Sequence, residues 1–157
     1  MPALRKPVDE SFFASAPERY SDTFAIARPA EKVWADLVSD KPLAWCRGLS
    51  VHWTSDRPFG VGTTRQAASL GGAVKLKERY FIWEDGHRQA FYVTETNLPL
   101  FKRFAEDYVV EADGADRCRL TWKAAIEPTA LGRPGAPLNG FIFRRMFAET
   151  RRHYGAS

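Results

Sequence analysis

The sequence has 157 residues, of which 45% are hydrophobic and 27% charged, and its formal net charge is +4. This length suits one domain that buries a core without disulfide bonds, and the composition excludes disordered and collagen-like chains. The opening MPALRKPVDE lacks the apolar stretch of a secretory signal, and no apolar run approaches the ~20 residues that span a bilayer, so we expect a cytoplasmic protein.

Residues 1–20 are rich in proline and show little periodicity, which predicts a lead-in segment to a single domain over 21–157. Phe12 and Phe13 are the aromatic side chains of this segment, and we expect them to pack against the domain. Apolar and polar residues then alternate over 22–27, which predicts the first strand.

A short helix should follow the first strand. Pro29 suits the first turn of this helix, Glu31 favours the positive end of the helix dipole, and Pro42 limits its length. One face carries the apolar side chains Val33, Trp34, Leu37 and Val38. A second short helical turn is predicted over 43–46, before the next strand.

Six further strands are predicted in succession, separated by turn signals such as Gly71-Gly72, Asp85-Gly86 and Asp113-Gly114. Their ranges are 51–54, 63–69, 74–83, 89–95, 103–112 and 117–126. The alternation is clearest in the third of these strands, where basic side chains occupy one side. The other side carries Val74, Leu76, Glu78, Tyr80 and Ile82.

A glycine- and proline-rich stretch, 131–137, separates the last strand from a long helix predicted over 138–153. An antiparallel sheet of seven strands with one apolar face needs a cover, and this helix is long enough to provide it. We therefore predict an α+β fold in which a curved sheet wraps around the C-terminal helix, with two short helices between the first and second strands.

The excess positive charge lies at the C-terminal end, because residues 133–157 carry five Arg and one Glu. Arg144, Arg145, Arg151 and Arg152 interleave with apolar residues as on an amphipathic helix, which fits an ordinary solvated face. The alternative is that this face makes a weak peripheral contact with a membrane surface or an acidic macromolecule.

Several chemistries lack the residues that they need. The three histidines are scattered, and neither Cys46 nor Cys118 has a partner at metal-ligand or redox spacing, so we expect no metal site and two reduced, structural thiols. Gly60-Val-Gly62 has neither the third glycine nor the following helix of a nucleotide-binding loop. We therefore expect no cofactor.

Four strings, by their order and spacing, resemble the START-like superfamily, also called SRPBCC. They are Ala27-Arg-Pro-Ala-Glu-Lys-Val-Trp34, Pro58-Phe-Gly-Val-Gly-Thr-Thr-Arg65, Glu78-Arg79 after a Gly-Gly turn, and Arg119-Leu-Thr-Trp122. The similarity covers about residues 21–153 and looks most like the polyketide cyclase/dehydrase-type proteins. This resemblance implies a helix-grip fold with a cavity between the sheet and the C-terminal helix, which would hold an apolar or aromatic ligand.

Strand alternation assigns the side chains that face this cavity, and Val109 and Val110 leave either register open for the strand 103–112. The expected ligand-binding residues are Arg65, Ala67, Ser69, Leu76, Glu78, Tyr80, Phe91, Val93, Phe104, Glu106, Tyr108, Trp122, Ile142, Phe143 and Met146. Loops 70–73 and 97–101 should flank one mouth of the cavity.

Carboxylates on an inward face are unusual, because a buried charge is costly unless it is paired or hydrogen-bonded. Glu78 and Arg65 have matching parity on neighbouring strands, so they form either a structural pair or contacts to the hydroxyl or carbonyl of a ligand. Tyr108 and Trp122 combine a large ring with a polar tip, which suits either core packing or a ligand.

Two functions follow as hypotheses. The first is a carrier or sensor that encloses a small hydrophobic or aromatic molecule of lipid, polyketide or isoprenoid type, with Arg65, Glu78, Tyr80 and Tyr108 fixing its polar end. The alternative is an aromatase or cyclase acting on a polyketide-like substrate, with Glu78 or Glu106 as base and Tyr80 or Tyr108 as proton donor. No nucleic-acid partner is expected.

Overall fold

The computed structural model describes residues 6–157, so residues 1–5 of the predicted lead-in lie outside the described residues. The strands are β1 (Glu18–Ile26), β2 (Ser50–Trp53), β3 (Thr64–Ser69), β4 (Val74–Glu84), β5 (Arg88–Thr96), β6 (Phe101–Ala112) and β7 (Cys118–Pro128). The helices are α1 (Phe12–Ser15), α2 (Ala30–Leu37) and α3 (Ala136–Tyr154), with 3-10 turns η1 (Leu70–Gly72) and η2 (Arg133–Gly135). Within the described range no helix has the length and apolar character needed to cross a bilayer.

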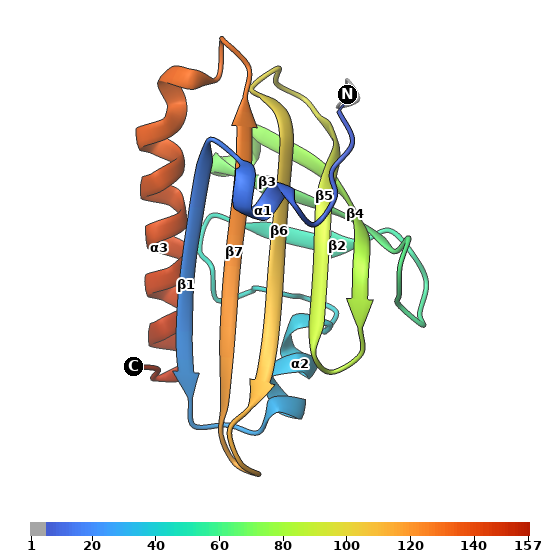
Figure 1. Ribbon diagram of the computed structural model, residues 1–157, viewed down its shortest axis with the longest axis vertical. Coiled ribbons are helices and arrows are strands. Elements are labelled where there is room, and N and C mark those ends of the chain that lie inside the picture. The colour runs from blue at the N-terminus through green and yellow to red at the C-terminus, as the bar shows by residue number, and fades with distance from the viewer. Residues whose placement is uncertain (1–5) are drawn as a thin grey trace.

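All seven strands form one antiparallel sheet in the order β1-β7-β6-β5-β4-β3-β2. The sheet curls so strongly that β2 and β3 run across the back of the long strands β6 and β7 (Figure 1). The predicted seven-stranded curved sheet with a long C-terminal helix is therefore confirmed.

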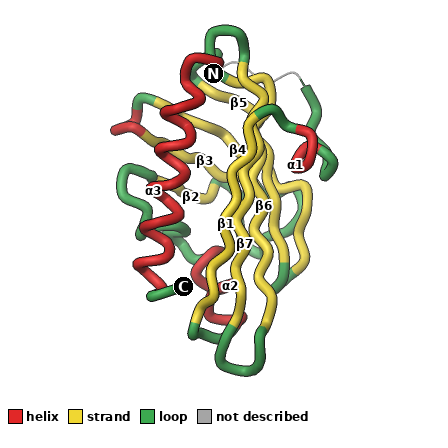
Figure 2. The backbone as a smooth tube through the Cα atoms, turned by 60° about the vertical axis from the view of Figure 1, so that its left-hand side comes forward, coloured by secondary structure: helices red, strands yellow, loops and turns green. Residues whose placement is uncertain are grey.

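Helix α3 runs along the inner face of the sheet (Figure 2). Its Phe143 stacks on Tyr20 of β1 with 5.0 Å between ring centroids, and its Phe147 meets Trp122 of β7 edge-on at 5.2 Å. The helix ends at Gly155, whose φ of 58° is the left-handed conformation that glycine adopts readily. The aromatic contacts therefore hold α3 against the β1 side of the sheet.

Between β1 and β2 the structure has one helix, α2, where two were predicted. Residues 43–46 form a turn in which the Cys46 N–H donates to the Leu43 carbonyl at 2.9 Å. Leu43 has φ of 58°, which lies outside the right-handed helical region and prevents the turn from continuing as a helix. The prediction of a second short helix was therefore wrong.

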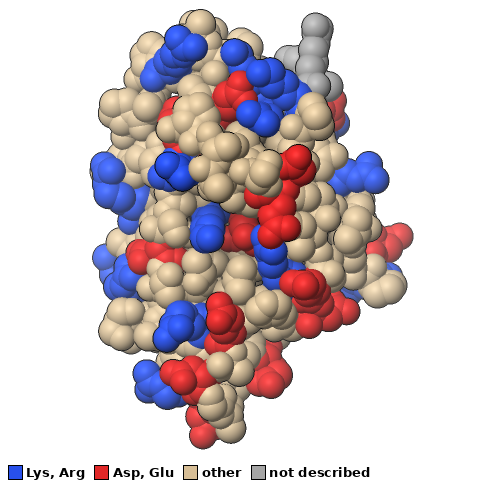
Figure 3. All heavy atoms as spheres, in the orientation of Figure 1, with Lys and Arg blue, Asp and Glu red and all other residues tan. Residues whose placement is uncertain are grey.

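The lead-in segment packs on the outer face of the sheet, opposite α3 (Figure 2). Phe12 is only 1% exposed, and it clusters with Ala105 of β6 and Ala125 of β7. The Arg103 guanidinium lies 4.4 Å from the Phe12 ring centroid. Around this segment, acidic and basic side chains are interspersed over the outer face (Figure 3).

The registers of β6 and β4 are both settled by packing. In β6 the inner set is Phe104, Glu106, Tyr108 and Val110. In β4 a register shift between Tyr80 and Ile82 brings Trp83 against Tyr80, with ring centroids 5.0 Å apart. Strict alternation assigns Ile82 to that position, so the bulge changes which side chain continues the inner face.

Candidate functional site

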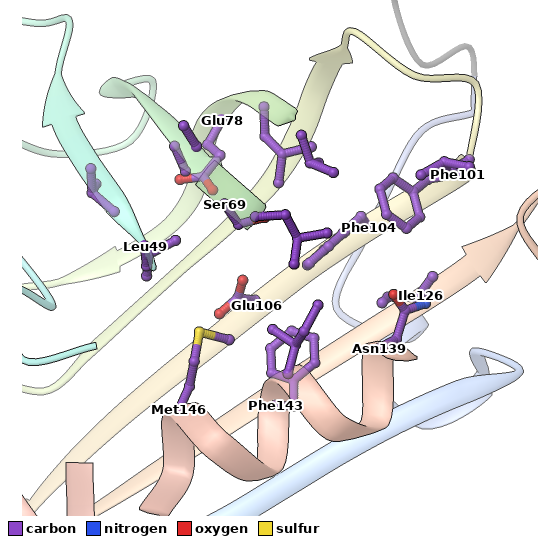
Figure 4. Close-up of a pocket in the computed structure, with 18 of the residues that line it drawn as sticks. Leu49, Ser69, Glu78, Phe101, Phe104, Glu106, Ile126, Asn139, Phe143 and Met146 are labelled. Carbon is purple, nitrogen blue, oxygen red and sulfur yellow. The ribbon is translucent and has the colours of Figure 1, made fainter. Parts of the chain in front are cut away.

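A cavity of about 290 Å³ lies between the inner face of the sheet and α3 (Figure 4). Its lining is mostly apolar and comes from β2, β3, β4, β6, β7, α3 and the segments that precede β2, β4, β6 and α3. The apolar wall includes Leu43, Leu49, Val51, Ala67, Leu76, Phe101, Phe104, Ile126, Ile142, Phe143 and Met146. Three charged side chains, Arg65, Glu78 and Glu106, also line the cavity.

The cavity opens between three leucines from separate segments. Leu70 in η1, Leu131 before η2 and Leu138 in α3 line it and are 47%, 68% and 48% exposed. The side chain of Asn97 links two of the loops, because it donates to the Ala73 carbonyl at 3.0 Å and accepts from the Lys75 N–H at 2.8 Å. Loops 70–73 and 97–101 therefore lie side by side, and Leu70, Leu100 and Phe101 from these loops line the cavity.

Arg65 and Glu78 are direct partners on the neighbouring strands β3 and β4. The Arg65 Nε donates to Glu78 Oε2 at 2.5 Å, and both side chains are 3% exposed. The guanidinium lies 4.5 Å from the ring centroid of Phe91 and 5.5 Å from that of Tyr80, so two aromatic faces hold it in place. Burial raises the pKa of Glu78, while the charge of Arg65 acts to lower it.

The Arg65 guanidinium has hydrogen-bond donors that Glu78 does not use. Among the described residues its hydrogen bond to Glu78 uses the Nε–H alone, which leaves the N–H groups of both Nη atoms. Nearby, the Tyr80 hydroxyl is buried and has no hydrogen-bond partner within residues 6–157. At this end of the cavity the described residues therefore leave N–H donors of Arg65 available, and the Tyr80 hydroxyl behind the lining is also unsatisfied.

Glu106 faces Glu78 from the other side of the cavity (Figure 4). One carboxylate oxygen, Oε1, accepts from the Tyr108 hydroxyl at 2.9 Å and from the Trp122 Nε1 at 2.7 Å. Burial and the charge of Glu78 raise the pKa of Glu106 to about 7, against the opposing effects of Trp122 and Arg65. Burial, followed by the Glu106 charge, also raises the pKa of Tyr108 well above its usual range.

The cavity is lined by the predicted site residues with the exception of Tyr80, Phe91 and Val93. These three are buried, at 1%, 0% and 2% exposure, on the inner face of β4 and β5. Tyr80 and Phe91 lie against the guanidinium of Arg65, so they support a lining residue from behind. Their assignment to the cavity wall is corrected, because the sheet curls around them and fills the space with aromatic rings.

Several lining residues were not predicted. Leu43, Leu49 and Val51 come from the irregular segment before and into β2, which carries no usable periodicity. Leu138 and Asn139 belong to α3 and precede the predicted Ile142 and Phe143 by one turn. Helical spacing of three and four residues, extended toward the N-terminus, would have identified this second pair.

Other chemistry-bearing groups do not gather at the cavity. Residues 6–157 contain no cluster of three or more His, Cys, Asp or Glu side chains that could hold a metal ion. Cys46 and Cys118 are both free and buried, and burial raises the pKa of the Cys46 thiol to about 12. At neutral pH the Cys46 thiol is therefore protonated.

Comparison with known proteins agrees with this architecture. A family model described as polyketide cyclase / dehydrase and lipid transport matches residues 17–153. An uncharacterised protein of Mycobacterium tuberculosis is 36% identical over 154 residues, covering 93% of this chain and 90% of that protein. An uncharacterised protein of Mycobacterium bovis matches equally well.

Two solved structures share the fold. A START superfamily protein from Mycobacterium smegmatis aligns with a TM-score of 0.69 at 13% identity, over 87% of this chain and 97% of that one. The Zhui aromatase/cyclase from Streptomyces aligns with a TM-score of 0.64 at 15% identity, over 86% and 94%. These likenesses confirm the START-like, helix-grip fold.

Proposed function

Because the chain belongs to the polyketide cyclase/dehydrase and lipid transport family, we propose that it binds a small amphipathic molecule in the cavity, as a carrier or sensor. The observation that carries this proposal is a mostly apolar cavity with Arg65, Glu78 and Glu106 buried at one end. Apolar walls supply affinity, while a few placed polar groups fix the orientation of a ligand.

The polar end of the cavity favours an oxygen-bearing group. The spare N–H groups of Arg65 can donate to a hydroxyl or carbonyl oxygen. Both hydrogen bonds that Glu106 accepts from residues 6–157 go to Oε1, so Oε2 is available to accept from a ligand. A hydroxyl can use both sides at once, since it accepts and donates. We therefore infer a ligand with a phenol, alcohol or ketone at one end.

The cavity volume sets the size of the ligand. About 290 Å³ is roughly twice the ~150 Å³ apolar cavity that accommodates benzene. A fused bicyclic aromatic body, or an alkyl chain of similar volume, fills this space. Longer molecules would extend through the mouth between Leu70, Leu131 and Leu138.

Matched bicyclic probes test the proposal by calorimetry. We expect 1-naphthol to bind at least tenfold more tightly than naphthalene, and Ala67→Phe, which fills the cavity wall, to abolish both interactions. Val61→Ala serves as a control, because Val61 is 71% exposed in a hairpin away from the cavity. Equal affinity for the two probes, or unchanged binding to Ala67→Phe, would overturn the proposal.

Acid–base catalysis is the second candidate, and one observation favours it. The pKa of about 7 at Glu106 suits a general base near neutral pH, as cyclisation of a polyketide-like substrate requires. Tyr108 hydrogen-bonds to that carboxylate, whereas Tyr80 does not line the cavity and its ring packs against the Arg65 guanidinium. The raised pKa of Tyr108 makes it a weak proton donor, so we assign the proton transfer to Glu106.

The variant Glu106→Gln distinguishes the two candidate functions, ligand binding and acid–base catalysis. A catalytic Glu106 predicts that the variant binds a polyketide-like substrate but no longer converts it, as followed by mass spectrometry. A purely binding cavity predicts no product with either protein. Full turnover by Glu106→Gln would exclude Glu106 as the base.

A further inference from the structure

The exposed apolar side chains of this protein gather at one place. Six large apolar residues in the described part of the chain are substantially exposed, and all but Val61 lie in segments that line the mouth of the cavity. The five that lie in these segments are Leu70, Leu98, Leu131, Leu138 and Phe141. Leu98 sits in the turn that Asn97 links to the η1 loop, and Phe141 lies one turn beyond Leu138 on α3. Such a concentration of exposed apolar surface marks an interaction site.

The charged residues of the mouth segments that make no ion pair within residues 6–157 are all basic. The segments that form the mouth, 66–77, 96–105 and 128–148, contain seven basic residues and no acidic one. Lys77, Arg103 and Arg145 are paired with glutamates that belong to other segments. The other four basic residues of these segments make no ion pair within residues 6–157: Lys75, Lys102, Arg133 and Arg144.

The arginines of α3 differ in whether they make ion pairs. Arg151 makes two hydrogen bonds to the Asp22 carboxylate, at 2.9 and 3.0 Å, and Arg145 pairs with Glu149. The Arg144 guanidinium, in contrast, lies over Gly140, one residue before Phe141. Within residues 6–157, α3 therefore has two arginines without an ion pair: Arg144, next to the segment that carries Leu138 and Phe141, and Arg152 in the last turn of the helix.

We propose that the mouth of the cavity docks on the surface of an anionic membrane, with Leu70, Leu131 and Leu138 entering the head-group layer and the four unpaired basic residues contacting lipid phosphates. Apolar side chains with basic residues nearby are the pattern by which peripheral proteins bind anionic lipid, because the apolar groups enter the interface and the cations are attracted to the lipid phosphates. A ligand could then pass between the bilayer and the cavity without crossing water.

The same features argue against two other partners. A second copy of this chain, docked about a two-fold axis, would bring the same unpaired cations against each other, with no acidic residue in the mouth segments to offset them. Nucleic acid would use the cations but would leave the protruding leucines without an apolar partner.

Vesicle binding tests the proposal without any cavity ligand, so its outcome is independent of the function proposed above. Wild-type protein should co-sediment with vesicles of phosphatidylcholine and phosphatidylglycerol, bind at least tenfold more weakly to phosphatidylcholine alone, and dissociate as salt is raised. Lys102→Glu/Arg133→Glu should weaken binding at least tenfold, and Leu131→Gln/Leu138→Gln at least fivefold.

Matched controls carry the same changes at other sites. Arg117→Glu/Arg152→Glu alters net charge equally, and Val61→Gln removes an equally exposed apolar side chain, so both should bind within twofold of wild type. Leu131→Cys labelled with a polarity-sensitive dye should shift to the blue on anionic vesicles, whereas labelled Val61→Cys should not; both native cysteines are buried.

Several results would overturn the proposal. These are equal binding to the two vesicle types, equal losses in the control variants, and no dye shift at position 131. Self-association that the leucine variants abolish would assign the surface to a second copy. Tighter binding to duplex DNA than to anionic vesicles, insensitive to Leu131→Gln/Leu138→Gln, would assign it to a nucleic acid.

Discussion

Glu106 is the cavity carboxyl whose pKa is raised to about 7, close to neutral pH. Its charged form loses hydration on burial and is repelled by Glu78, and these effects exceed the stabilisation from Tyr108, Trp122 and Arg65. Near neutral pH the side chain therefore exchanges between a hydrogen-bond donor and an acceptor. A group in this condition can adapt to either a carbonyl or a hydroxyl ligand.

We predict that Glu106→Gln becomes increasingly stabilising relative to wild type as pH rises from about 4.5 to 7. Over this range the folded wild type holds a proton that the unfolded chain releases, so its stability falls with rising pH. The loss amounts to about 3 kcal/mol above pH 7. Urea unfolding of both proteins across this range measures the difference, and parallel curves would contradict the prediction.

Removing one member of the buried Arg65–Glu78 ion pair should be costly, whereas replacing both members should cost much less. Glu78→Gln leaves the Arg65 charge buried without its partner, and we expect the free energy of unfolding to fall by about 3–5 kcal/mol. The double variant Arg65→Met/Glu78→Leu should recover most of that loss, because an apolar pair of similar volume replaces two desolvated charges.

Denaturant unfolding of the single and double variants checks this prediction. Lys77→Gln is the control, since it breaks the exposed Lys77–Glu95 pair and should cost less than about 1 kcal/mol. If the double variant recovers stability and loses 1-naphthol binding, the ion pair serves the ligand more than the fold. A double variant as unstable as Glu78→Gln would contradict this interpretation.

At the scale of elements, the mouth depends on how the β7–α3 connection closes over the β5–β6 turn. The Thr129 N–H donates to the Leu100 carbonyl at 3.0 Å, and the Thr129 hydroxyl donates to the Pro99 carbonyl at 2.7 Å. A Cβ at Gly132 would lie 2.0 Å from the Leu100 oxygen. The glycine is therefore required by the close approach of two backbones.

Gly132→Ala should destabilise the protein by about 1–3 kcal/mol or more and disturb the mouth, because a backbone rather than a side chain must move. Gly135→Ala, in the same connection, meets nothing within 4 Å and has φ of −80°, so it should be neutral or stabilise by about 0.4–1 kcal/mol. Thermal unfolding compares the two variants. Equal effects would show that the close approach at Leu100 is not maintained.

For the molecule as a whole, an occupied cavity should behave as part of the core. A ligand that binds only the folded state at a hundredfold excess over its Kd adds about 2.7 kcal/mol, which for this chain length raises Tm by about 5–10 °C. We expect this shift for wild type with 1-naphthol and none for Ala67→Phe. A similar shift in both proteins would place the ligand outside the cavity.

Much of the fold follows from local patterns in the sequence. Alternation of apolar and polar residues predicted the strands, and the predicted bounds of β3 and β4 differ from those in the structure by no more than one residue. Parity alone also placed Arg65 and Glu78 on the inner face, whereas it left the register of the strand that carries Glu106 open. These properties are local, because period-two alternation reports the buried face of a strand without reference to its neighbours.

Only the tertiary structure decides which inner residues line a cavity and which fill the core. Tyr80 and Phe91 share the inner face with Glu78, yet sheet curvature and the bulge before Ile82 place their rings behind Arg65. The leucines of the mouth come from three segments that are distant in sequence. Curvature, bulges and helix placement arise from contacts between such segments, so no local period encodes them.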